Sequence, residues 1–176
     1  SKLNALVELY KNGKFQSVFT SVKKLTDADP TSVMAWNILG AASAQLGRNS
    51  SALEAFQKVV CLDPNHAEGW NNLGRVMQIA GEFKKAKIAC QNAITLRPEY
   101  AEAYLNLGNA FFEDGEREKS LISYITAISL KNDYKDAYRN AAFIAGCVDR
   151  LPRHPEMESV LSKILRSDGY VRPKSI

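Results

Sequence analysis

Histidine and cysteine are scarce in this sequence of 176 residues, which has two histidines and three cysteines. Neither His66 nor His154 has a cysteine, a histidine or a carboxylate at the spacing typical of metal ligands. Cys61, Cys90 and Cys147 are an odd number at wide intervals, a pattern that fits reduced, buried thiols better than a disulfide framework. The sequence therefore predicts no metal site, no cofactor and a reducing compartment.

Long apolar runs and a signal-peptide pattern are also missing. No stretch of 18 apolar residues occurs, which is the length that a membrane-spanning helix needs. We therefore expect a cytoplasmic protein with no membrane partner. Because residues 1–10 already follow an amphipathic pattern, we expect the sequence to be part of a longer chain.

An excess of charge of one sign is absent. The net charge is +4, and residues 30–147 carry twelve basic and twelve acidic side chains. A nucleic-acid-binding protein usually concentrates basic residues on one face or stripe. The even balance predicts that nucleic acid is not a partner.

Catalytic motifs are lacking as well. The sequence contains neither the phosphate-binding pattern GxxxxGK[ST] nor the nucleophile pattern GxSxG. Four carboxylates cluster around one expected turn, and a solvated turn explains them better than a pair of catalytic acids: Glu113, Asp114, Glu116 and Glu118. We predict no catalytic residue and no enzyme activity for this part of the protein.

What the sequence does contain is a repeat of 34 residues. When the chain is compared with itself at this shift, glycines, prolines, aromatic residues and leucines fall into register. The aligned rows are Gly13, Gly47, Gly81 and Gly115; Pro30, Pro64 and Pro98; Gly40, Gly74 and Gly108; Trp36, Trp70, Tyr104 and Tyr138; and Leu39, Leu73 and Leu107.

Each repeat is predicted to form two antiparallel helices. Trp70, Leu73 and Met77 lie on one helical face, and the apolar residues of 83–94 form a second such face. Gly81 lies between the two, where a left-handed residue would end the first helix. Small residues on both helices, such as Gly74, would let the pair pack closely.

The pattern W-x-x-L-G, followed by a small residue, a bulky residue and a closing proline, resembles the tetratricopeptide repeat. The resemblance covers three full units in residues 33–130, an incomplete unit in residues 1–32 and one further helix in residues 135–148. It implies an all-α fold, a right-handed superhelical solenoid of antiparallel helix pairs. The repeats are similar to those of the O-linked N-acetylglucosamine transferase type.

The pattern breaks after residue 148. Asp149 stands where a glycine is expected, and two prolines follow within residues 149–156. The amphipathic stretch that comes next predicts a C-terminal capping helix, since the last repeat of a solenoid must cover its apolar face. We therefore divide the chain into a repeat array (1–148), a break with a capping helix (149–168) and a tail or linker (169–176).

The surface for binding is predicted on the first helix of each repeat, opposite its core row. In a stacked solenoid this side lines the concave wall, and the family resemblance implies a peptide-binding groove there. One row of this wall is rich in asparagine, a poor helix former, and another is acidic. The candidate binding residues are Asn4, Glu68, Asn72, Arg75, Glu102, Asn106, Asn109, Asp136, Asn140 and Phe143.

Two interpretations of the asparagine row remain open. Its amides could bind the backbone of an extended peptide, because each offers donors and an acceptor. They could instead bond to neighbouring helices and bind nothing. The acidic row could select a basic partner, although the helix dipole alone also stabilises carboxylates near the start of a helix.

The leading functional hypothesis is a non-catalytic protein-interaction module that binds a segment of another protein in the concave groove. Two alternatives are the substrate-recruiting region of a larger glycosyl-, sulfo- or methyltransferase and a scaffold that self-associates through its solenoid ends. The basic clamp with which some of these repeats grip acidic chaperone tails is absent, because Leu3, Val7 and Glu102 occupy its positions.

Overall fold

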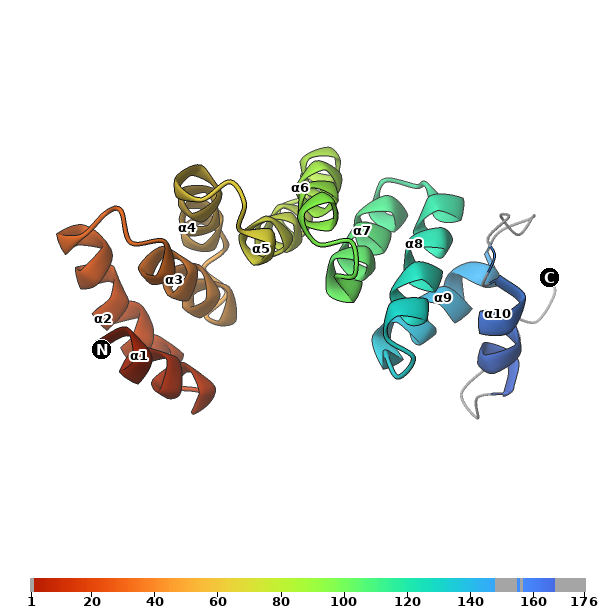
Figure 1. The fold of residues 1–176 in the computed structure, drawn as a ribbon, viewed down its shortest axis with the longest axis horizontal. Coiled ribbons are helices and arrows are strands. Elements are labelled where there is room, and N and C mark those ends of the chain that lie inside the picture. The colour runs from red at the N-terminus through yellow and green to blue at the C-terminus, as the bar shows by residue number, and fades with distance from the viewer. Residues whose placement is uncertain (1, 148–154, 156, 167–176) are drawn as a thin grey trace. The chain divides into compact units, whose positions relative to one another are not determined.

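The computed structural model describes residues 2–147, 155 and 157–166. The all-α prediction is confirmed, because these residues form ten helices and no strand (Figure 1). The helices are α1 (Lys2–Lys11), α2 (Phe15–Ala28), α3 (Val33–Gln45), α4 (Asn49–Leu62), α5 (Ala67–Ile79), α6 (Phe83–Leu96), α7 (Ala101–Glu113), α8 (Arg117–Leu130), α9 (Lys135–Ala145) and α10 (Met157–Arg166).

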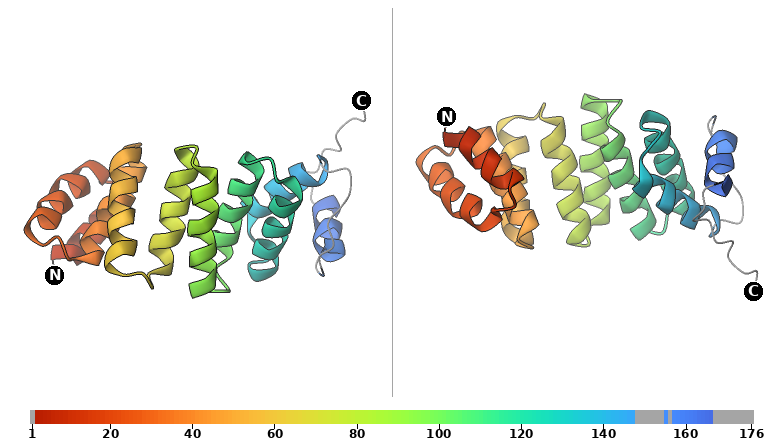
Figure 2. Two further views of the ribbon diagram at one scale, coloured as in Figure 1. Left: turned by 90° about the horizontal axis from the view of Figure 1, so that it is seen from above. Right: turned by 90° about the horizontal axis from the view of Figure 1, so that it is seen from below.

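One glycine in each turn ends the first helix of a pair, as expected for Gly81. Gly81 has a φ of +77°, in the left-handed region where a side chain is disfavoured. The N–H of the next residue, Glu82, bonds back to the carbonyl of Met77 at 2.9 Å. Gly13, Gly47 and Gly115 have the same backbone conformation. This turn reverses the chain and makes the two helices antiparallel (Figure 2).

A second set of glycines lets the paired helices approach closely. A Cβ on Gly74 would lie 2.6 Å from the sulfur of Cys90 and 3.2 Å from the carbonyl oxygen of Ala86. Gly40 and Gly108 face the rings of Phe56 and Tyr124 in the same way. The predicted packing role of these glycines is therefore confirmed, with a bulky residue of the second helix filling the space.

The N-terminal unit comprises residues 1–96 and contains α1 to α6. Its helices contact one another in chain order, and α3 also contacts both α1 and α5. The first helices of these three pairs therefore lie next to one another. The core of the unit includes buried side chains from α1, α2 and α3, among them Leu6, Val18, Val22 and Leu39.

The C-terminal unit comprises residues 97–176 and contains α7 to α10. Tyr124, Ile128 and Ile144 are buried in its core, together with Met157 and Val160 of α10. Helix α10 contacts α8 and α9, so the amphipathic stretch predicted to cap the array does cover apolar residues of the last repeat. The predicted break at Asp149 and the tail lie outside the described residues.

Two tryptophans connect successive repeats by a hydrogen bond. The indole N–H of Trp36 donates to the carbonyl of Pro30, and that of Trp70 donates to the carbonyl of Pro64, both at 2.8 Å. Both rings are half-buried, although the sequence pattern placed Trp70 in the core row. The ring lies at the repeat boundary because its polar N–H needs an acceptor there.

The helices of this protein are short compared with the thickness of a membrane. Within the described ranges, none is both long enough and apolar enough to cross a bilayer.

Candidate binding face

The candidate binding residues lie on the first helix of each pair, namely α1, α3 and α5 in the N-terminal unit and α7 and α9 in the C-terminal unit. We call this side of the first helices, taken separately in each unit, the first-helix face. In the N-terminal unit it comprises Asn4, Met34, Glu68, Asn72, Arg75 and Ile79. In the C-terminal unit it comprises Glu102, Asn106, Asn109, Phe112, Glu113, Asp136, Asn140 and Phe143.

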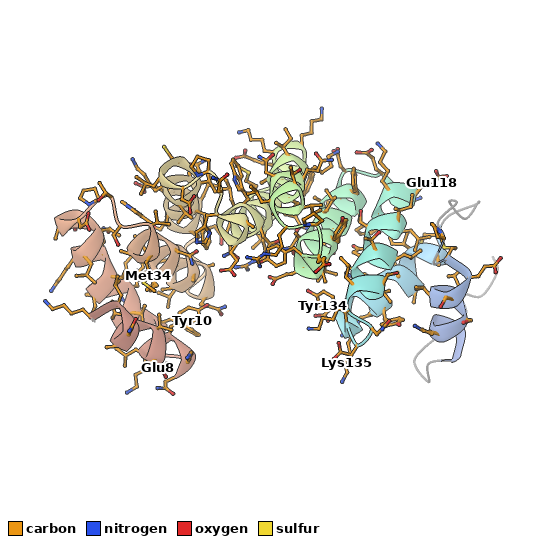
Figure 3. The ribbon with its side chains drawn as sticks, in the orientation of Figure 1. Glu8, Tyr10, Met34, Glu118, Tyr134 and Lys135 are labelled. Carbon is orange, nitrogen blue, oxygen red and sulfur yellow. The ribbon has the colours of Figure 1, made fainter. Side chains whose placement is uncertain are left out.

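Apolar side chains are exposed on the first-helix face of the N-terminal unit. Ile79 on α5 is 54% exposed and Met34 on α3 is 49% exposed. Figure 3 labels Met34. Asn72 and Arg75, one helical turn apart on α5, are half-buried. Asn4 and Glu68 are exposed, and each already has an interaction partner within the protein. This part of the face therefore combines accessible aliphatic area with polar groups.

Burial differs along the predicted asparagine row. Asn106 on α7 is only 5% exposed and has a partner within the protein, whereas Asn72 and Asn140 are half-buried. Ile38, which holds the equivalent position on α3, is also buried. The amides of the row therefore do not present equal areas to solvent, and Asn106 lies beneath the surface.

A buried phenol joins three helices of the C-terminal unit. The hydroxyl of Tyr124 on α8 donates to Oδ1 of Asn109 on α7 at 2.7 Å, and the amide nitrogen of Asn140 on α9 donates to the same oxygen at 3.1 Å. Burial raises the pKa of the Tyr124 hydroxyl, so it stays protonated and remains a donor. Asn140 thus bonds to a neighbouring helix, as one interpretation of the row predicted.

Next to this network, two aromatic rings meet at the surface. The rings of Phe112 on α7 and Phe143 on α9 lie edge to face, with centroids 5.9 Å apart. Phe143 is 62% exposed, the largest value among the exposed large hydrophobic side chains described. Glu113, which follows Phe112, is also exposed, and its charge adds to the rise in the pKa of Tyr124.

At the start of α9, carboxylates and cations surround a tyrosine. Burial, followed by the charges of Glu102 and Asp136, raises the pKa of Tyr134 to about 12. The ammonium of Lys131 lies 5.0 Å from the centre of the same ring, and Asp136 pairs with Arg139 at 3.2 Å. Figure 3 labels Tyr134 and Lys135 at this end of α8 and Glu118 at the other. Asp136, one of the acidic residues predicted here, is therefore already paired with a cation.

His66 and Cys90 have structural roles, whereas Cys61 and Cys147 are exposed, so the expectation that all three thiols are buried is wrong for these two. Nδ1 of His66 accepts a hydrogen bond from the N–H of Gly69 at 2.9 Å and so caps the start of α5. Cys90 is buried, and burial raises its pKa from 9.0 to about 12. In the part of the chain that the structure describes, no three His, Cys, Asp or Glu residues are grouped as a metal site.

Four surface or core residues were missed at the sequence level. Asn71 is fully buried and Asn37 is half-buried, although Asn72, the neighbour of Asn71, was assigned to the wall. The repeat pattern gives no indication that Phe112 belongs to the surface, because the equivalent positions of the two preceding repeats hold Ala44 and Gln78. Tyr134 directly precedes α9, the first helix of its repeat. The residues at the same position two and three repeats earlier, His66 and Ser32, form helix caps.

Comparisons with known families identify the repeat. Residues 5–67 and residues 101–134 match family models described as tetratricopeptide repeat, and residues 80–115 match one described as TPR repeat. A comparison with curated proteins found no significant match.

Solved structures with the same fold include several repeat proteins. A crystal structure of MamA is 28% identical, with a TM-score of 0.73, and the match covers 90% of this chain and 87% of that one. A protein of Thermus thermophilus, described as a thermophilic TPR protein, is 22% identical, with a TM-score of 0.70 and coverage of 94% and 89%. The first repeat domain of Spaghetti (RPAP3), bound to the HSP90 peptide SRMEEVD, is 20% identical, with a TM-score of 0.64 and coverage of 65% and 91%.

Proposed function

Because this chain is built of tetratricopeptide repeats, we propose that it is a non-catalytic interaction module that binds a segment of a partner protein on its first-helix face. The repeat is commonly a protein–protein interaction module. The peptide held by the Spaghetti repeat domain supports this kind of ligand for the fold.

The observation that carries the proposal is the exposure of large apolar side chains on the first-helix face. Ile79, Met34 and Phe143 each keep about half or more of their area in water. Burying such area against a partner yields roughly 25 cal/mol for each Å² removed from water. The three side chains lie on α5, α3 and α9, so both units offer a contact area.

The polar groups of the face add bonds to the partner's backbone. Asn72 and Arg75 are half-buried, a position in which side-chain donors reach a ligand while their stems remain packed. An extended peptide presents carbonyl oxygens at regular intervals, and amide and guanidinium N–H groups are suitable donors to them. We therefore expect the partner segment to bind in an extended conformation.

The test compares two isoleucines of nearly equal exposure on different helices. Ile79 on α5 is 54% exposed and Ile88 on α6 is 58% exposed, but only Ile79 belongs to the first-helix face. The chain and its Ile79→Ser and Ile88→Ser variants are used to capture partners from cells, and the captured proteins are quantified by mass spectrometry. Surface changes of this kind leave stability within about 0.5 kcal/mol, so both variants should fold.

We expect Ile79→Ser to lose partners that the parent chain and Ile88→Ser retain. Equal capture by all three chains would contradict the proposed face. Loss with Ile88→Ser alone would place the interaction on the second helices instead.

A further inference from the structure

The C-terminal unit has a more specific feature, formed where α7 and α9 meet. Phe112 contacts Phe143, and Asn109 contacts Asn140, both with a separation of 31 residues along the chain. The equal separations mean that the two helices run in the same direction with a fixed register. Along this seam, the amide pair is followed about one helical turn later, or roughly 5 Å, by the aromatic pair.

We propose that this aromatic pair anchors one large apolar side chain of the partner segment. A lysine or arginine within two residues of that side chain, in the same segment, pairs with Glu113. The inference rests on the proposed function and names the partner's chemistry at one point of the first-helix face.

The anchor is argued from the state of the two rings. Phe143 is 62% exposed, whereas Phe112 is half-buried and contacts it edge to face. Phe112 thus holds one side of the Phe143 ring and leaves most of its area in water. A large apolar or aromatic side chain of a partner would remove that area from water and add a ring contact.

The side-chain amides of Asn109 and Asn140 indicate where the backbone of the partner segment would lie, next to the aromatic pair. Oδ1 of Asn109 already accepts two hydrogen bonds, from Tyr124 and from Asn140. What remains on these amides is both N–H groups of Asn109, one N–H of Asn140 and the oxygen of Asn140, so the pair can bond to both the carbonyl oxygens and the N–H groups of a peptide backbone. The buried Tyr124 hydroxyl fixes the amides before a ligand arrives, and such preorganisation lowers the entropic cost of binding.

The sign of the partner's charge follows from Glu113. Its side chain follows Phe112 in the sequence, is exposed, and lies near enough to Tyr124 for its charge to raise the pKa of that hydroxyl. Among the residues that the structure describes, no cation pairs with it. Asp136 and Glu116, by contrast, already pair with Arg139 and Lys119. A cation close to the anchor therefore gains attraction at Glu113 without displacing an existing ion pair, and an acidic residue there is repelled.

The test uses labelled ten-residue peptides in which one phenylalanine or leucine is followed, one or two positions later, by lysine, with serine and glycine elsewhere. Two control sets replace the lysine with glutamate or the apolar residue with serine. Binding to the full chain is measured by fluorescence anisotropy. We expect lysine peptides to bind at least fivefold more tightly than glutamate peptides, and the serine controls to bind at least tenfold more weakly.

Matched variants assign the effect to the site. Phe143→Ala should weaken the lysine peptides at least tenfold, whereas Leu130→Ala, at a 41% exposed position on α8, should leave them unchanged. Glu113→Gln should reduce the preference for lysine over glutamate at least threefold, whereas Glu118→Gln, on α8, should not. Circular dichroism of each variant confirms that the helices remain.

Three results would overturn the inference. One is equal affinity for lysine and glutamate peptides, and another is unchanged affinity in Phe143→Ala. The third is that no peptide binds and the chain forms a dimer that the Phe143→Ala substitution dissociates. A second copy of the chain would then occupy the site. If no peptide binds but Ile79→Ser still loses a captured partner, this inference is wrong and the proposed function stands.

Discussion

The sulfur of Cys90 occupies the space that a side chain on Gly74 would need, since a Cβ there would lie 2.6 Å from Sγ. The same relationship holds between Gly108 and Tyr124, at 2.6 Å from Cε1 of the ring. In each pair, one glycine thus allows the two helices to approach closely, Gly74 between α5 and α6 and Gly108 between α7 and α8. This close approach sets the spacing of the two helices within each pair.

Replacing Gly74 with alanine should destabilise the protein by about 1–3 kcal/mol, because an added methyl group in a packed interior forces neighbouring atoms to move. Equilibrium unfolding in urea measures the change. The double variant Gly74→Ala/Cys90→Ala should lose less stability than the sum of the two single variants, because removing the sulfur makes room. Additive losses would show that the contact does not limit the packing of this pair.

Replacing Trp70 with phenylalanine should cost about 1–2 kcal/mol, since the hydrogen bond to the carbonyl of Pro64 is lost and the phenyl ring is smaller than the indole. Trp36→Phe, which removes the equivalent bond to Pro30, should have a similar effect on unfolding in urea. An unchanged unfolding midpoint in both variants would mean that water replaces the indole at no cost.

Thiol reactivity at pH 8 should separate Cys90 from Cys61 and Cys147. Cys61 and Cys147 are exposed, whereas Cys90 is buried and its pKa is raised to about 12. Because the thiolate is the reactive form, a chromogenic disulfide reagent should modify two thiols rapidly and the third only when the protein unfolds. Rapid modification of all three would contradict the burial of Cys90.

The same pKa shift predicts how stability depends on pH. The raised pKa means that the folded protein keeps the Cys90 proton at pH values where the unfolded chain has lost it. This contribution is fully present below pH 9.0 and is lost as the pH rises toward about 12. Cys90→Ala should therefore lose stability less steeply than the parent chain over that range, as urea unfolding at a series of pH values would measure. Equal slopes in the two chains would contradict the shift.

Much of the fold could be predicted because the repeat sets the positions of its glycines and apolar residues. Gly81 was expected in a left-handed turn and Gly74 at a close helix contact, and both have these roles. Each depends on local geometry or on the two helices of one unit, which a single repeat specifies. The half-buried position of Trp70 was not expected, because it depends on a hydrogen bond to the preceding repeat.

The binding face was harder to predict from periodicity. Advancing by about 100° per residue assigns a side to each side chain, but it does not show how much a neighbouring helix covers that side. Asn106 was expected on the wall and is 5% exposed. Phe112 was not considered, and it contacts Phe143 because α7 and α9 share a register that arises from tertiary packing.

The central claim is that a partner segment binds the first-helix face. Hydrogen exchange of the chain, measured by mass spectrometry with and without a partner obtained by capture, tests it most directly. We predict that a bound partner slows exchange in α5 and α9, around Ile79 and Phe143, and leaves α6 and α8 unchanged. Slower exchange in α6 and α8, with unchanged exchange in α5 and α9, would contradict the account.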